Sequence, residues 1–150
     1  MSPEKSEELR NVYPNLFSDS CEGSCVRLFG FECSDGWFEL LRECIQKIGE
    51  VCEREGLDIQ ASQVKEKYGT LRFYIGGSAI AKIASSIVDD LVSYAEQMSS
   101  VICEVCGAAK YGRIRTRYAN VFTRVKGGWY KTLCDECAIK LEYPVDEVEE

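Results

Sequence analysis

Apolar side chains recur at helical spacing in two long stretches of the chain. The first stretch predicts a helix over residues 36–55 that ends at Gly56, and the second predicts a helix over residues 79–99. Ser34 or Asp35 is expected to cap the first helix by accepting backbone N–H groups. Trp37, at the start of that helix, is expected to anchor the core.

Between these two helices, apolar and polar residues alternate, which is typical of strands. Residues 57–68 and 71–75 therefore predict two strands joined by a turn at Tyr68-Gly69-Thr70. Because the connection is so short, the two strands are expected to pair as an antiparallel hairpin.

One face of that hairpin would carry Lys65, Lys67 and Arg72, since alternate residues of a strand share a face. Glu66 stands among these cations in the sequence. We therefore interpret the face as an ordinary exposed strand surface.

Shorter apolar segments occupy the C-terminal third of the chain. Residues 113–118, 122–125 and 129–133 predict short strands, and Gly127-Gly128 turns the chain between the last two. A short helix is expected near Asp135. The predicted fold class is α+β, with two amphipathic helices flanking a β-hairpin, followed by a four-cysteine zinc-ribbon-like module.

The same pattern divides the chain into four parts. Residues 1–33 are expected to form an irregular entry segment with at most a short strand, and residues 34–100 a helix–hairpin–helix core. Residues 101–140 would form the zinc-ribbon-like module, and residues 141–150 an acidic tail whose end is expected to be disordered.

Two cysteine pairs give the clearest chemical signal in the sequence. Cys103 and Cys106 are separated by two residues, as are Cys134 and Cys137, and 27 residues lie between the pairs. This spacing lets one tight turn direct two sulfurs at a single ion, and Gly107 suits such a turn. Four thiolates in this arrangement predict one structural, tetrahedral Zn²⁺ site. Buried or redox cysteines are the alternative.

The other five cysteines give weaker signals. Cys21, Cys25 and Cys33 have a loose spacing, and a second zinc site on them is not favoured, because no fourth ligand is evident beyond Cys44 or a carboxylate. Cys44 and Cys52 fall on the apolar side of the first predicted helix, where core packing is expected.

Catalysis is not expected. Four thiolates fill the coordination sphere of a zinc ion, whereas a catalytic zinc keeps one position open. The chain has no histidine, the commonest general base near neutral pH. It also lacks a Gly-x-Ser-x-Gly motif and a dinucleotide-binding fingerprint, so the sequence indicates no catalytic and no cofactor-binding residues.

Composition restricts the size of the fold and the cellular compartment that the chain suits. The chain has 150 residues, 45% of them hydrophobic, which suits one domain with a small metal-stabilised appendage. No apolar stretch is long enough to span a membrane, and the polar, acidic N-terminus does not resemble a signal peptide. The cysteine count of nine is odd, which favours metal binding in a reducing cytoplasm over disulfides.

Charge is distributed unevenly. The formal net charge is −7, yet residues 107–133 contain seven basic residues and no acidic one. Aromatic side chains are interleaved with these cations, a combination that binds phosphates and unstacked bases. Candidate nucleic-acid contacts are Arg113, Arg115, Arg117, Arg124, Lys126 and Trp129. The cations could instead balance the charge of a zinc–thiolate site, dock on the acidic body or meet a protein partner.

Four motifs in fixed order point to a family. They are Cys33-Ser-Asp-Gly-Trp37, the segment Val64–Tyr74, Cys103-Glu-Val-Cys-Gly107 and the segment Trp129–Cys137. This order resembles a family of small uncharacterised proteins encoded by phages and prophages, and the resemblance covers roughly residues 30–138. It implies an accessory protein that acts in the host cytoplasm on host defence or host machinery.

The expected function is therefore that of a non-catalytic zinc-containing binding protein. Its partner is expected to be a host protein or a protein–nucleic-acid complex. Direct nucleic-acid binding through the basic, aromatic zinc ribbon is the alternative. The sequence does not indicate an oligomeric state.

Overall fold

A computed structural model describes residues 1–18, 26, 29–77, 82–110 and 119–145. The fold class is α+β, as predicted. The elements are, in chain order, α1 (Pro3–Val12), the 3-10 helix η1 (Pro14–Phe17), β1 (Phe31–Glu32), the 3-10 helix η2 (Asp35–Trp37), α3 (Phe38–Glu55), β2 (Ile59–Lys67), β3 (Thr70–Gly77), α4 (Lys82–Ser99), β4 (Val121–Lys126), β5 (Trp129–Cys134) and α5 (Asp135–Lys140).

A three-stranded sheet in the order β1-β2-β3 lies at the centre of the larger body. β2 and β3 form the predicted antiparallel hairpin, and the short strand β1 pairs with β2 in parallel. The two central residues of the hairpin turn, Tyr68 and Gly69, have φ angles of 54° and 79°. Positive φ at both positions is what a type I′ turn requires, and this turn matches the twist of the strands.

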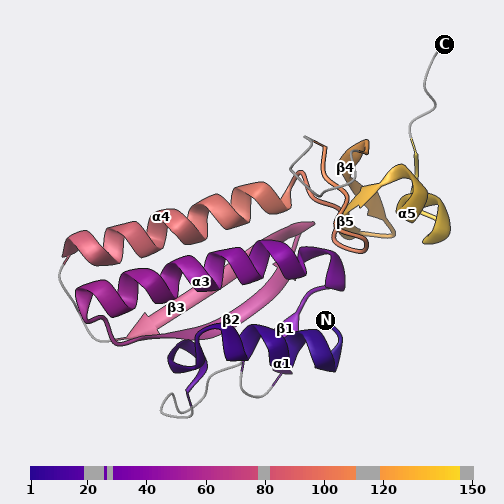
Figure 1. Ribbon diagram of the computed structural model, residues 1–150. Helices are drawn as coiled ribbons and strands as arrows, with labels where there is room; N and C mark the ends of the chain where they lie inside the picture. Colours follow the sequence, from indigo (N-terminus) through magenta and orange to yellow (C-terminus); the bar gives the residue numbers. More distant parts are fainter. Residues whose placement is uncertain (19–25, 27–28, 78–81, 111–118, 146–150) are drawn as a thin grey trace.

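The core lies between this sheet and helix α3, with α4 packed beside α3 (Figure 1). Trp37, Ile45 and Ile48 are fully buried and meet Val64 and Leu71 of the sheet in one apolar cluster. Burial of each such side chain stabilises the fold by about 1.5–3 kcal/mol. The predicted helices and the anchoring role of Trp37 are thus confirmed.

Helix α4 also covers the outer edge of the sheet. The backbone N–H of Leu71 donates to Ser99 Oγ at 2.8 Å, and that of Phe73 donates to Glu96 Oε1 at 2.9 Å. Both N–H groups belong to the edge strand β3, and α4 supplies both acceptors. Side chains of the helix thus take the place of a further strand at this edge.

The expectation of an irregular segment is wrong for residues 3–12, which form helix α1. Pro3 occupies the first turn, where proline is favoured. The acidic Glu4 lies near the N-terminal end of the helix and the basic Arg10 near its C-terminal end, as the helix dipole favours. Leu9 is fully buried. Tyr13, at the end of the helix, packs so closely on α3 that a Cβ atom at Gly49 would lie 2.9 Å from its ring. Packing on α3 thus stabilises a helix whose own apolar pattern is weak.

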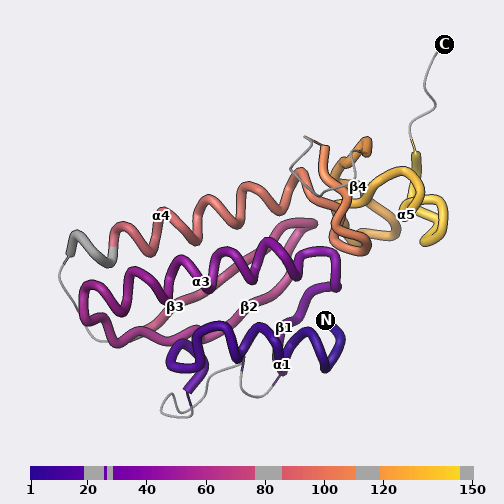
Figure 2. Tube along the Cα trace, in the orientation of Figure 1, coloured from indigo at the N-terminus to yellow at the C-terminus, as the bar shows by residue number. Residues whose placement is uncertain are grey.

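A smaller C-terminal module, comprising residues 101–110 and 119–145, lies beyond the end of the sheet that carries the β2–β3 turn (Figures 1 and 2). β4 and β5 form an antiparallel hairpin whose turn, Gly127-Gly128, has φ angles of 56° and 83°. Helix α5 follows, so the two strands, the glycine turn and the short helix predicted here are confirmed.

Some predictions fall outside the described residues. These are the strand over residues 113–118, the positions of Cys21 and Cys25, and the last part of the acidic tail. Among the helices that the structure does describe, none is both long and apolar enough to cross a membrane.

Candidate metal centre

The four cysteines of the two predicted pairs lie together in the C-terminal module. The Sγ atoms of Cys103, Cys106, Cys134 and Cys137 all lie within 4.8 Å of one another. The residues after Ile102 deliver the first pair, and the junction of β5 with α5 delivers the second. Four thiols at this separation can hold one metal ion, so the predicted ligand set is assembled by the fold.

Burial and hydrogen bonds set the acidity of these thiols. Burial raises the pKa of Cys103 and of Cys137, although backbone N–H groups of Val105, Cys106 and Cys134 favour a thiolate at Cys103. Burial also raises the pKa of Cys106, but hydrogen bonds from the Ala108 N–H and the neighbouring thiols have a larger, opposite effect. The pKa of Cys106 is therefore lowered to about 7. The cluster therefore gains its full negative charge only when a cation replaces the protons.

Metal affinity is expected to fall steeply as the pH falls. The pKa values of Cys103 and Cys137 are raised, so both thiols carry protons near neutral pH and must lose them to bind metal. These two protons alone correspond to a loss of affinity of about 100-fold per pH unit, and protons released by the other thiols add to it. Competition with a chromophoric chelator between pH 8 and pH 6 measures this slope, and a pH-independent affinity would contradict the thiolate site.

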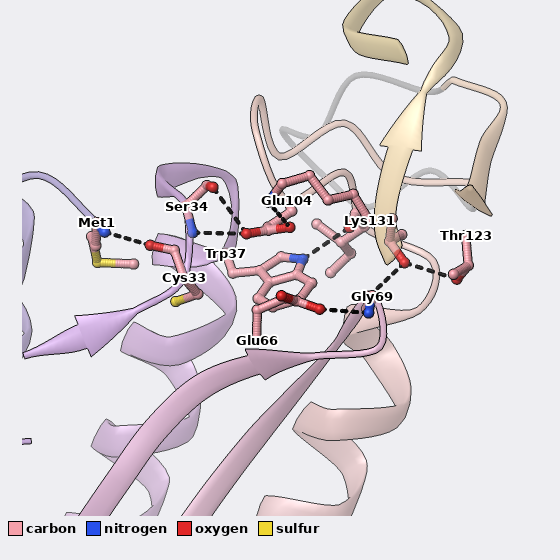
Figure 3. Close-up of polar contacts among 11 residues, drawn as sticks. Met1, Cys33, Ser34, Trp37, Glu66, Gly69, Glu104, Thr123 and Lys131 are labelled. Atoms are coloured by element: carbon pink, nitrogen blue, oxygen red, sulfur yellow. Dashed lines mark hydrogen bonds and ion pairs between the residues drawn. The ribbon is translucent and has the colours of Figure 1, made fainter. Parts of the chain in front are cut away.

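Glu104 is a central residue of the site that the sequence did not reveal. Its side chain is only 1% exposed although it is charged. Glu104 Oε1 accepts hydrogen bonds from the backbone N–H of Ser34 at 3.1 Å and from Ser34 Oγ at 2.9 Å (Figure 3). Glu104 Oε2 forms an ion pair with Lys131 Nζ at 2.9 Å. The carboxylate thus connects the first cysteine pair to both β5 and the larger body.

Close backbone packing reinforces this connection. Gly36 N donates to the Glu104 carbonyl at 2.7 Å, and Trp37 Nε1 donates to the Ile102 carbonyl at 2.9 Å. A Cβ atom at Gly36 would collide with the carbonyl oxygens of Cys103 and Glu104. Gly36 is therefore required for the close approach of the η2 turn to the first cysteine pair. The expected capping role is wrong, because Ser34 bonds to Glu104 and Asp35 accepts from the backbone N–H of Ser2.

A second contact joins the β2–β3 turn to the β4–β5 hairpin. Thr132 Oγ1 donates to the Gly69 carbonyl at 2.6 Å and lies 2.9 Å from Thr123 Oγ1 (Figure 3). A Cβ atom at Gly69 would lie 2.7 Å from Thr123 Cγ2. We call these two contact regions together the joint. In the first region Ser34–Trp37 meets Ile102–Glu104, and in the second Gly69 meets Thr123 and Thr132.

Several of the described basic residues of the ribbon form ion pairs within the protein. Arg124, a candidate nucleic-acid contact, is buried, pairs with Asp135 and donates to the Pro144 carbonyl at 2.7 Å. Lys126 pairs with Glu142 at 3.0 Å. A guanidinium held in this way is not available to phosphate, which removes Arg124 from the accessible candidates. Trp129 remains 76% exposed, and Arg113, Arg115 and Arg117 lie outside the described residues.

Two of these ion pairs hold residues next to the cysteines. Glu104 directly follows Cys103 and pairs with Lys131, while Asp135 directly follows Cys134 and pairs with Arg124. Each pair fixes the backbone beside one half of the cluster. These two cations thus pair with carboxylates of the protein, and backbone N–H groups contribute to the stabilisation of the thiolates.

The remaining described cysteines do not join the cluster. Cys33, Cys44 and Cys52 are buried, which confirms core packing for the last two. Burial raises the pKa of Cys33 and of Cys44 to about 12. Within the described residues, Cys103, Cys106, Cys134 and Cys137 form the one group that can hold a metal ion.

Comparison with known proteins finds no family model, no curated protein and no solved structure that matches this chain.

Proposed function

We propose that this protein is a non-catalytic, zinc-stabilised binding protein of phage or prophage origin. Its partner in the host cytoplasm is a host protein, alone or in a complex with nucleic acid. Four cysteines within 4.8 Å of one another support zinc, because thiolates suit this ion and fill its tetrahedral sphere. A filled sphere leaves no position for a substrate, and the chain has no histidine to act as a base.

One observation carries the protein-binding proposal: exposed aromatic side chains lie beside the joint. Tyr68 is 66% exposed and Tyr130 is 41% exposed, and their rings meet edge to face at 5.7 Å. Val125 is also exposed and stands opposite Tyr130 in the β4–β5 hairpin. We call these three residues the joint surface. Exposed tyrosines on a rigid support are typical of protein interfaces.

Zinc contributes by keeping this surface in shape. Tyr130 lies on β5, the strand that ends at Cys134, whereas Tyr68 lies on the hairpin turn of the larger body. The two tyrosines stay together only while the C-terminal module is folded and docked. Nucleic-acid binding through the ribbon receives less support, since Arg124, Lys126 and Lys131 already pair with carboxylates.

Substitution of the joint surface is expected to abolish partner binding without loss of the fold. Tyr130→Ser combined with Val125→Ser removes two exposed side chains that contribute little to the core. Capture from a bacterial extract by the metal-loaded protein should lose its specific partner by about 30-fold or more, as for an interface hot spot. Ile139→Ser is the matched control, because Ile139 is 66% exposed on α5 of the same module.

The comparison is quantitative mass spectrometry of the captured proteins, with metal content and thermal unfolding measured in parallel. Equal capture by the double variant and the wild-type protein would contradict the assignment of this surface. If the Ile139→Ser control also failed to capture the same partner, the effect would not be specific to the joint surface.

A further inference from the structure

We propose that the outer face of the β2–β3 hairpin binds single-stranded nucleic acid. This surface contains none of the cysteines, and it adjoins the joint surface only at Tyr68, whose ring lies beside Lys67. The inference does not depend on the function proposed above. It rests on the register of the hairpin, on the pairing of its charges and on its aromatic side chains.

The register places three cations on one face. Lys65 stands opposite Arg72, Lys67 opposite Thr70, and Gln63 opposite Tyr74. The intervening pair Val64 and Phe73 is buried in the core cluster with residues of α3. Because alternate residues of a strand point to opposite faces, the cations and Tyr74 lie on the side that α3 does not cover (Figure 1).

Glu66 does not neutralise this face, in contrast to the interpretation from sequence. It stands opposite Leu71, on the core side, and its Oε1 accepts from the Gly69 N–H at 2.6 Å. Glu32 on β1 is the carboxylate beside Lys65 in register, and it accepts from Gln63 Nε2 at 3.0 Å. Among the described residues, no ion pair involves Lys65, Lys67 or Arg72.

The cations of helix α3 form ion pairs, whereas those of the hairpin face form none with a described residue. Arg42, Lys47 and Arg54 on α3 each pair with a glutamate of the same helix. Arg72 instead donates to Thr70 Oγ1 at 2.8 Å and to the Leu71 carbonyl at 2.7 Å, which fixes its guanidinium without neutralising it. In a chain of net charge −7, three cations thus lie on one face of the hairpin and form no ion pair with a described carboxylate. Charge complementarity favours a polyanion there.

Aromatic side chains favour nucleic acid over an acidic protein segment. Lys65 Nζ lies 6.0 Å from the ring centroid of Tyr74, and Lys67 Nζ lies 5.5 Å from that of Tyr68. Tyr74 is 43% exposed on the same face as the cations. Lys65 and Lys67 are two residues apart on one strand, about 6.7 Å along its axis, a spacing that suits successive phosphates. Tyrosine rings stack on unpaired bases, which a duplex does not present.

The test is fluorescence anisotropy of the zinc-loaded full chain with a short labelled oligothymidylate across a salt series. Three phosphate contacts predict a loss of affinity of about 20-fold between 50 and 200 mM salt. The triple variant Lys65→Gln, Lys67→Gln, Arg72→Gln should flatten that salt dependence. Tyr74→Ala should weaken binding by about fivefold or more through lost stacking, with the salt slope unchanged.

The matched control is the triple variant Arg42→Gln, Lys47→Gln, Arg54→Gln, which changes the net charge equally on α3. It should bind the oligonucleotide as the wild-type protein does, apart from a small long-range effect. Single variants at Lys67 and Arg72 serve if the triple variant fails to fold, and each should reduce the salt slope in part.

Several results would overturn the proposal. Absence of binding at low salt would do so, as would equal weakening by both triple variants. Equal affinity for a matched duplex, or no effect of Tyr74→Ala, would exclude base stacking. Competition by polyglutamate as effective as that by unlabelled oligothymidylate would assign the face to acidic proteins instead.

Discussion

Replacement of Cys134 by serine is expected to unfold the C-terminal module while the sheet and its helices stay folded. Cys134 is only 1% exposed and ends β5, so its loss removes one of the four cysteines of the candidate metal site. The apolar cluster of the module contains few large side chains, chiefly Val121 and Leu133. Structural zinc contributes on the order of 10 kcal/mol to such small units, which their own core cannot replace.

Two measurements separate the module from the larger body. Metal content should fall from one equivalent to none, and amide protection should disappear in β4 and β5 but persist in α3 and β2. Cys52→Ser is the control, since Cys52 is a buried cysteine outside the cluster, and this variant should keep its metal. A Cys134→Ser protein with bound metal and a protected β4–β5 hairpin would contradict the prediction.

Gly36→Ala is expected to separate the two bodies without removing the metal ligands. A Cβ atom at residue 36 would lie 2.5 Å from the carbonyl oxygen of Glu104 and closer still to that of Cys103. Both obstacles are backbone atoms beside a metal ligand, so a side-chain rotation cannot relieve the clash. Overpacking of this kind costs about 1–3 kcal/mol or more, and the Gly36 N–H to Glu104 hydrogen bond is lost with it.

Trp37 reports this separation directly. Its indole is fully buried and donates to the Ile102 carbonyl, so undocking should shift its fluorescence to the red. The second tryptophan, Trp129, is exposed and is replaced by phenylalanine in all variants to isolate the signal. Gly76→Ala is the matched control, because a Cβ atom there meets nothing within 4 Å. Unchanged unfolding midpoint and emission in Gly36→Ala would show that the clash is relieved.

Local patterns were sufficient to predict much of this protein. The helix over residues 36–55 follows from apolar side chains at helical spacing, and the hairpin from alternation around Tyr68-Gly69. The four-cysteine cluster follows from the cysteine spacing alone, because two such turns need only be brought together to form a site that can hold a metal ion. Each of these signals is contained in a short stretch of sequence.

Features that depend on distant residues were not predictable in this way. Helix α1 has few apolar residues of its own and is stabilised by Tyr13 packing on Gly49 of another helix. Glu104 occupies a position between two cysteines where the motif accepts any residue, and only the fold brings Ser34 and Lys131 to its carboxylate. Gly36 looks like an ordinary turn glycine in the sequence. The joint is therefore visible only in three dimensions.

The side-chain acceptors on α4 have a consequence for how copies of this protein can associate. Ser99 and Glu96 already hold the Leu71 and Phe73 amides of β3, so a strand from another molecule finds those donors occupied. Strand addition at this edge would first have to displace a helix that is anchored in the core. The hairpin therefore resists domain swapping and fibril growth from β3, which leaves the opposite edge, at the two-residue strand β1, and the sheet face for any such association.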